Sequence, residues 1–333
     1  CFGFDSVVGN FASPCAPGTA YVLLHHVFGE VNGKKGTWGH AIGGMGAITQ
    51  AMRQEAEARG VEIRTGQGVA RIATREGQAR GVTLDNGDTI EARSVVSNAH
   101  PRALLKLVDD DSSAAWREPF ANYQSESATL RMNVALAELP DFTCLPGSNA
   151  QPHHSSGIIM APSLAFMERA YDDARADGWS REPIVEMLIP STVDDSLAPK
   201  GAHVASLFCQ HFRYALPGGR SWDAERNRAA DAVIDQVTKF APNFKRSVLG
   251  RRVLAPADLE REFGLVGGDI FHGKLTLNQL FSARPVLGHG DYRMPLKGLY
   301  LCGSGAHPGG GVTGVPGHNA AREILRDFRK LKA

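Results

Sequence analysis

The chain has 333 residues, of which 43% are hydrophobic and 21% are charged. Its 36 basic and 35 acidic residues give a formal net charge of +1 at pH 7, so no strong field of one sign would attract nucleic acid. No apolar run approaches the roughly 18 residues that a membrane-spanning helix needs, and contact with a membrane surface is left open. The length favours two domains, or one domain with a large insertion.

The five cysteines are odd in number and widely spaced, without a CxxC pair: Cys1, Cys15, Cys144, Cys209 and Cys302. This pattern predicts neither a disulfide framework nor a zinc site. We therefore expect a reducing compartment, the cytoplasm, with the mitochondrial matrix as the alternative in a eukaryote. The chain begins at Cys1 without an initiator Met or a signal-peptide pattern, so we expect a truncated protein.

The first half of the chain begins with residues 1–40, which are rich in Gly, Pro and aromatic side chains and predict loops and short helices. Apolar residues then recur at helical spacing and predict an amphipathic helix over residues 47–59, ended by Gly60. Alternating apolar and polar residues at 61–65 and 69–73, followed by a strand at 81–84, predict antiparallel strands with a hairpin turn at Asn86-Gly87. One more strand is expected at residues 92–96.

Residues 102–294 predict a mixed layer of helices and strands. The clearest helices are expected at 222–240 and 257–263, and the clearest strands at 184–189 and 203–210. A short buried strand at 298–302 and a helix at 318–330 then flank a glycine-rich stretch.

That stretch, residues 303–317, contains seven glycines in fifteen residues. Without Cβ atoms, its backbone can approach a flat or anionic ligand closely. The helix that follows directs its free N–H groups and positive dipole end at the same place, which favours a phosphate or another anion. A flexible surface loop is the alternative interpretation.

The segment from Gly298 to Gly317 resembles the closing flavin motif of the carotenoid-desaturase and amine-oxidase superfamily, and its His-Pro-Gly-Gly-Gly form is most similar to the phytoene-dehydrogenase-related group. The same group is matched by residues 43–46, 61–99, 256–264, 267–273 and 279–285. The resemblance implies an α/β, FAD/NAD(P)-binding two-domain flavoprotein fold with an α+β substrate layer, and FAD as its cofactor.

The resemblance also implies a division into four segments. Residues 1–42 would belong to the substrate domain, 43–101 to the FAD domain, 102–294 to the substrate-binding domain, and 295–333 to the closing strand, loop and helix of the FAD domain. No GxGxxG turn precedes Gly43, so we expect the fold to be truncated at its N-terminus and the dinucleotide cradle to be missing. This chain should bind FAD weakly or not at all, and the intact protein fully.

Site residues follow from the resemblance residue by residue. Val69 would meet the adenine edge through its backbone, although an ordinary sheet residue is the alternative. Arg284 could equally be a surface ion-pair residue, and His25 a hydrogen-bonded structural histidine. The implied cofactor-binding residues are Gly43, Gly44, Val69, Ser97, Asn98, Gly303, Ser304, Gly309, Gly310, Gly311 and Val312, and the implied catalytic residues are His307, Arg284 and His25.

Two other patterns are weaker. The pairs His25-His26 and His153-His154 invite a metal site, but adjacent side chains converge poorly on one ion, and no metal is predicted. Ser304 lies in Gly-Ser-Gly without the GxSxG spacing, which argues against a serine hydrolase.

The expected function is that of an FAD-dependent dehydrogenase, desaturase or oxidase. Its flavin would accept a hydride from a small lipophilic or amphipathic substrate. A flavin-dependent isomerase and a non-catalytic interaction module are the alternatives, and protein partners are left open.

Overall fold

The computed structural model describes residues 2–27, 29–108, 116, 118–147 and 149–330, and the chain divides into two compact units. Unit 1 comprises Cys1–Ile63 and Ala128–Phe263, and unit 2 comprises Arg64–Ser127 and Gly264–Ala333. These boundaries differ from the predicted segments, because the helix after Gly44 belongs to unit 1 and residues 264–294 belong to unit 2. The assignment of segments to flavin and substrate domains stays a prediction.

Unit 1 is built on an antiparallel five-stranded sheet with the order β11-β7-β10-β9-β8. Its strands are β7 (Thr129–Leu136), β8 (Ile158–Met160), β9 (Ile184–Leu188), β10 (His203–Gln210) and β11 (Val248–Leu254). A separate two-stranded ribbon pairs β1 (Glu30–Val31) with β2 (Lys34–Lys35).

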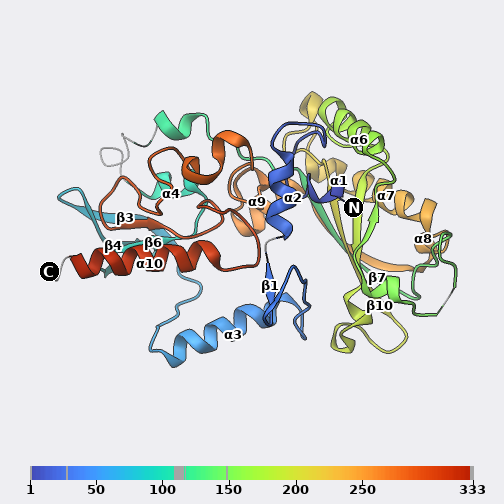
Figure 1. Cartoon of the computed structure of the whole chain (residues 1–333), viewed down its shortest axis with the longest axis horizontal. Coiled ribbons are helices and arrows are strands. Elements are labelled where there is room, and N and C mark those ends of the chain that lie inside the picture. The colour runs from blue at the N-terminus through green and yellow to red at the C-terminus, as the bar shows by residue number, and fades with distance from the viewer. Residues whose placement is uncertain (1, 28, 109–115, 117, 148, 331–333) are drawn as a thin grey trace. The chain divides into compact units, whose positions relative to one another are not determined.

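The core of unit 1 lies on one face of this sheet. Alternate residues of β7, from Leu130 to Leu136, are buried, and so are Ala205, Leu207 and Cys209 of β10. The long helix α7 (Trp222–Phe240) packs its apolar side against them (Figure 1). The opposite face is covered in part as well, because Phe208 and Ile159 pack against a second apolar cluster that includes Phe166 and Met167.

Further helices surround the sheet or extend from it. They are α1 (Phe2–Asp5), α2 (Thr19–Val27), α3 (Met45–Ala58), α6 (Leu164–Asp177), α8 (Phe244–Ser247) and α9 (Pro256–Phe263). Helix α6 begins at the N-cap Ser163, whose Oγ accepts a hydrogen bond from the Phe166 N–H, and ends at Gly178 with φ +93°. Short 3₁₀ turns occur at Pro152–Ser155, Pro190–Thr192, Asp195–Leu197 and Pro217–Gly219.

Helix α3 confirms the predicted helix after the glycines, but its apolar side chains are not buried. Met45 and Met52 are each about two-thirds exposed, at 65% and 64%. The helical spacing of apolar residues therefore predicted the conformation correctly, whereas burial depends on contacts that this helix does not make within the described residues.

Unit 2 contains two small sheets. Strands β3 (Val69–Arg75), β4 (Gln78–Leu84) and β5 (Thr89–Glu91) form an antiparallel sheet, and the turn between β4 and β5 contains Gly87 with φ +90°. Strands β6 (Val95–Ser97) and β12 (Leu299–Leu301) pair in parallel. The predicted hairpin is confirmed, but the strand expected at 61–65 is wrong, because the structure has no regular element there.

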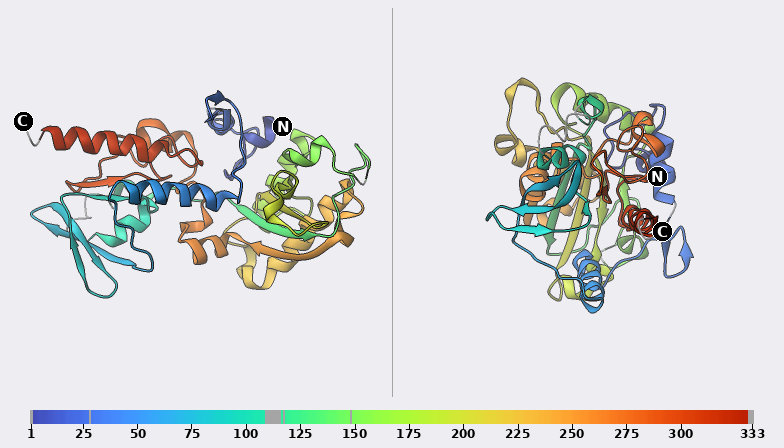
Figure 2. Two further views of the ribbon diagram at one scale, coloured as in Figure 1. Left: turned by 90° about the horizontal axis from the view of Figure 1, so that it is seen from below. Right: turned by 90° about the vertical axis from the view of Figure 1, so that its left-hand side faces the viewer.

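The core of unit 2 joins its sheets to its helices. Helix α4 (Pro101–Leu107) contacts β3, and α10 (Val315–Lys330), the red helix in Figure 2, lies beside β12. Short 3₁₀ turns occur at Val266–Gly268, Leu277–Gln279 and Phe281–Ala283. The side chains buried between these elements include Ile72, Leu104, Trp116, Tyr123, Leu299 and Leu301. Among the described helices of both units, none is long and apolar enough to cross a membrane.

Candidate functional site

The glycine loop of unit 2 joins the end of a buried strand to the start of a long helix. All three residues of β12 are buried, and β12 runs parallel to β6, so the segments that follow both strands emerge at the same edge. They approach closely, because a Cβ on Gly303 would lie 2.5 Å from the Asn98 carbonyl oxygen. Glycine at position 303 therefore allows the predicted residues Asn98 and Gly303 to meet.

The centre of the loop also needs glycine, for two different reasons. A Cβ on Gly310 would lie 2.1 Å from Cδ1 of the buried Phe271 ring, so position 310 has no room for a side chain. Gly309, Gly311 and Gly314 have φ values of +112°, +140° and +69°, which other residues rarely adopt. The glycine content thus reflects a defined conformation, which argues against a merely flexible loop.

The exposed part of the loop leads directly into helix α10. Residues 311–315 are exposed, Val312 with 69% of its surface, and the Val315 N–H donates to Thr313 Oγ1 at 3.2 Å. The first turn of this 16-residue helix contributes the positive end of the helix dipole, although Pro316 has no N–H and the His318 N–H bonds the Gly314 carbonyl. Such a helix start favours an anionic group.

Arg284 ties the glycine loop to neighbouring segments of unit 2 through hydrogen bonds. Its side chain is fully buried and its guanidinium donates to the backbone carbonyls of Phe271, Gly273, Gln279 and Ser304, at 2.6–3.3 Å. The alternative of a surface ion-pair residue is wrong, because no part of Arg284 reaches solvent. The structure gives it a positioning role, and its predicted contact with a substrate stays a prediction.

Three other predicted site residues of unit 2 are His307, in the glycine loop, Ser97, at the end of β6, and Val69, at the start of β3. The His307 ring lies 5.5 Å from that of Phe281, and its carbonyl accepts a hydrogen bond from the Tyr292 hydroxyl. Ser97 Oγ accepts from the Ala99 N–H and turns the chain after β6. Val69 pairs with Leu84 at the start of β3. Their predicted contacts with a cofactor remain untested.

Three candidates belong to unit 1. Gly43 and Gly44, with φ values of +87° and +82°, precede α3, and the Gly43 N–H donates to Asp194 Oδ2 at 2.7 Å. Hydrogen bonds from Ser196, Gly43 and His40 hold the pKa of the Asp194 carboxyl below its usual range. The Asp194 carboxylate thus anchors the segment before α3, which contains His40 and Gly43. His25 lies on α2, with its ring stacked at 6.1 Å on Tyr21.

A buried polar cluster in unit 2 was missed by the sequence-based prediction. The Asp269 carboxylate accepts from the N–H groups of Phe271 and Gly273 and from Ser125 Oγ, which lies 3.2 Å away. His100 Nε2 lies 2.7 Å from the same Ser125 Oγ. The residues come from three distant parts of the chain, so no local spacing could have indicated the cluster.

The protonation states in this cluster argue against a serine nucleophile. Burial, with the nearby charges of His272, Arg102 and Arg284, lowers the pKa of His100 to about 3, so the ring is neutral near pH 7. Its Nδ1 accepts from the Arg102 N–H, which leaves the proton on Nε2. His100 therefore donates to Ser125 and does not act as its base. Burial also raises the pKa of Asp269 to about 6.

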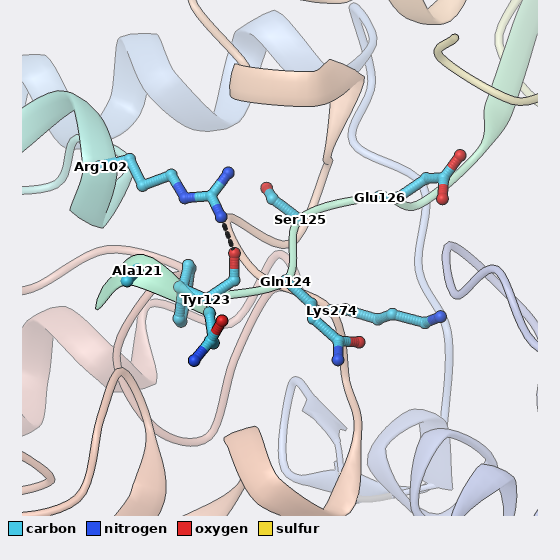
Figure 3. Close-up of a pocket in the computed structure, with 8 residues that line it drawn as sticks. Arg102, Ala121, Tyr123, Gln124, Ser125, Glu126 and Lys274 are labelled. Atoms are coloured by element: carbon cyan, nitrogen blue, oxygen red, sulfur yellow. Dashed lines mark hydrogen bonds between the residues drawn. The ribbon is translucent and has the colours of Figure 1, made fainter. Parts of the chain in front are cut away.

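A hollow of about 360 Å³ lies beside this cluster, and Figure 3 shows Arg102 reaching the backbone carbonyl of Tyr123. Its lining carries charges of both signs, from Arg102, Glu126 and Lys274. None of the predicted site residues lines it. Over the described part of the chain, no three His, Cys, Asp or Glu side chains gather as metal ligands; the His154 Nε2 instead lies 2.9 Å from the Pro140 carbonyl oxygen.

A buried strand, a glycine loop and the start of a long helix form an arrangement that many nucleotide-binding proteins use. Residues 4–128 match the family of flavin-containing amine oxidoreductases. The pyridine nucleotide-disulfide oxidoreductase domain-containing protein 2 of Rattus norvegicus is 44% identical over 98% of this chain and 58% of its own length. The chain thus spans less than two thirds of that relative.

More distant comparisons agree. The hydroxyneurosporene desaturase of Cereibacter sphaeroides is 28% identical, over 88% of this chain and 55% of that protein. The crystal structure of an oxidoreductase from Methanosarcina mazei has a TM-score of 0.62 at 18% identity, over 98% of this chain and 64% of that one. The match of residues 4–128 to the flavin-containing amine oxidoreductases agrees with these relatives, and the predicted α/β flavoprotein fold is confirmed.

The cofactor that this family implies is FAD, as predicted. The glycine loop fits one side of it: the exposed backbone at residues 311–314 carries no bulky side chain besides Val312, and the α10 N-terminus favours negative charge. Among the described residues, no GxGxxG turn precedes Gly43, and the glycines of residues 309–314, although spaced as GxGxxG, lie in the loop before α10. The residues present therefore fit only the part of FAD that would lie against the glycine loop.

Proposed function

We propose that this chain forms part of an FAD-dependent dehydrogenase, desaturase or oxidase that acts on a lipophilic or amphipathic substrate. The observation that carries the proposal is the loop of residues 303–317, whose glycines hold an exposed backbone at the start of α10. The names of the relatives support the redox class, and the desaturase among them supports an apolar substrate.

When bound, FAD supplies the acceptor for a hydride from a substrate carbon. In the proposed site, Gly310, Gly311 and Val312 would lie against the flavin ring, and the dipole end of α10 would favour negative charge on it. Arg284 is a positioning residue: its hydrogen bond to the Ser304 carbonyl fixes the start of the glycine loop. His307 is proposed to contact flavin or substrate, and His25 to line the substrate cavity.

The first experiment asks whether the chain holds FAD. The purified chain, and a longer form that includes the upstream sequence, are each mixed with FAD, separated from free cofactor and scanned for the flavin absorption band. We expect stoichiometric retention by the longer form and weaker retention by the chain alone. Absence of flavin from both, together with a folded circular dichroism spectrum, would favour a non-catalytic interaction module.

The second experiment separates redox chemistry from isomerisation. Candidate substrates are added anaerobically to the flavin-loaded protein, and the oxidised-flavin band is followed. Net hydride transfer leaves the band bleached until an electron acceptor is added. Product formation without net bleaching would indicate a flavin-dependent isomerase and contradict the proposal.

The proposal for the cellular compartment rests on the state of the cysteines. Among the described residues, Cys15, Cys144, Cys209 and Cys302 are free thiols. This supports a reducing compartment, the cytoplasm or the mitochondrial matrix.

A further inference from the structure

On the face opposite the core beneath α7, the sheet of unit 1 carries a row of residues that includes two charged side chains. Cross-strand pairing places five residues side by side across all five strands: Ile159, Glu186, Phe208, Arg131 and Leu254. In the next row, Asn133 and Arg252 are directly paired, and both are exposed. Because alternate residues share a face, this side of β7 and β11 is distinct from the apolar core.

Arg131 is unusual within this row because it is half-buried and no side chain or carbonyl among the described residues accepts a hydrogen bond from it. Its guanidinium lies 4.5 Å from the centre of the Phe208 ring, in a cation–π contact. Among the described residues, no carboxylate or carbonyl oxygen lies within hydrogen-bonding distance of it. Burial lowers the pKa of Arg131, and the more distant Glu186 only partly opposes this effect. A guanidinium has five N–H donors. Because no group of the described chain accepts from those of Arg131, they are available to a ligand.

A hollow of about 380 Å³ lies beside Arg131, within the range of small-molecule sites. Its lining combines Arg131, Asn133 and Arg252 with the apolar Leu254 and Phe263. The one carboxylate in the lining, Glu262, is already paired with Arg252 at 2.7 Å. The hollow therefore has an excess of positive charge at one end and apolar surface from Leu254 and the exposed Phe263.

We propose that this hollow binds an amphipathic organic anion, a carboxylate with an apolar chain. The carboxylate accepts hydrogen bonds from Arg131 and from the Asn133 amide, and the chain lies on Leu254 and Phe263. Arginine suits this role because its planar fork matches a carboxylate. The site goes beyond the proposed redox function, since every residue in it belongs to unit 1 and its occupation needs no flavin.

The test is calorimetric titration of the full chain with octanoate, with octan-1-ol and octylamine as neutral and cationic probes of the same length and acetate as the anion without a chain. We expect octanoate to bind at least tenfold more tightly than each of the other three. Arg131→Gln should weaken octanoate binding at least tenfold, and the exposed Arg252→Gln, which leaves the core untouched, at least threefold. Arg246→Gln is the matched control, because Arg246 is exposed in the same unit, outside the hollow.

Circular dichroism and thermal unfolding show whether each variant is folded. Equal octanoate affinity in Arg252→Gln and Arg246→Gln would overturn the proposal, even if Arg131→Gln failed to fold. Octanol binding as tight as octanoate would also overturn it, because the arginines would then contribute nothing. Since these titrations contain no FAD, their failure is distinct from failure of the proposed redox function.

Discussion

At the scale of single residues, close contacts in the glycine loop leave no space for a side chain at positions 303 and 310. Gly310 packs on Phe271, Gly303 lies against Asn98, and Arg284 ties the loop to the carbonyls beneath it. A buried guanidinium that donates to several carbonyls holds separate segments together, because loss of any one acceptor would leave a donor unpaired. These contacts fix the part of the loop between Gly303 and Gly310 against the core of unit 2.

Gly310→Ala should destabilise the protein by about 1–3 kcal/mol, because its Cβ would displace the buried Phe271 ring. Gly250→Ala is the matched control, since a Cβ there meets nothing within 4 Å and its φ is not positive. Urea unfolding measures both. Equal, small effects in the two variants would show that the loop adapts and that its packing is loose.

His100 gives a prediction about pH. Its pKa is about 3 in the folded protein, below the ordinary 6.5, so an unfolded chain takes up a proton between these values and the folded chain does not. Stability from this group is present above pH 6.5 and falls as the pH is lowered, by about 2 kcal/mol between pH 7 and pH 5. His100→Asn keeps an acceptor for the Arg102 N–H and should lose less stability over that interval.

The measurement is the free energy of unfolding in urea at pH 7 and at pH 5. Other titrating groups, including Asp269, are present in both proteins, so the comparison isolates position 100. An identical loss in the wild type and His100→Asn would rule out this histidine as the source.

At the scale of elements, helices begin and end where side chains satisfy their free backbone groups. Helix α6 has a serine N-cap and a left-handed glycine C-cap, and α7 begins after Ser221, whose Oγ accepts from the Ala224 N–H. These caps define the helix ends locally, whereas the faces that are buried depend on the sheet beneath.

Ser163→Ala should cost about 1 kcal/mol of stability, because the Phe166 N–H loses its acceptor at the start of α6. Ser163→Asp should retain most of that stability, since its carboxylate caps the same N–H and suits the helix dipole. Thermal unfolding of the two variants provides the measurement. The capping role is refuted if alanine and aspartate behave alike.

At the scale of the whole molecule, each unit has its own core. Leu207 is fully buried in the core of unit 1, and Leu104 is fully buried in that of unit 2. Both units are made from chain segments distant in sequence, so each core requires long-range contacts before it gains stability. Local unfolding should therefore follow unit boundaries.

Leu207→Ala should cost about 2–5 kcal/mol through the cavity it leaves. We expect hydrogen exchange to accelerate most for the amides of β7, β9 and β10, and less for those of β3 and β4 in unit 2. Leu249→Ala, which truncates an exposed leucine of β11, is the control and should change little. Uniform acceleration across both units would show that they unfold as one.

The sequence alone determined the features that depend on local chemistry. Apolar patterning between Pro and Gly residues predicted β10 and α7 with their observed bounds, Asn86-Gly87 predicted the hairpin, and the glycine motif indicated the flavoprotein family. These signals are local because turn conformation and amphipathic spacing act within a few residues.

Tertiary structure decided what each side chain meets. Residues 61–65 alternate like a strand but have no partner strand among the described residues, and α3 is amphipathic but exposes its methionines. The burial of Arg284, the His100–Ser125–Asp269 cluster and the position of Arg131 beside Phe208 all depend on segments far apart in the chain. Spacing along a sequence cannot encode such contacts, because they arise only when distant strands pair and bury one face.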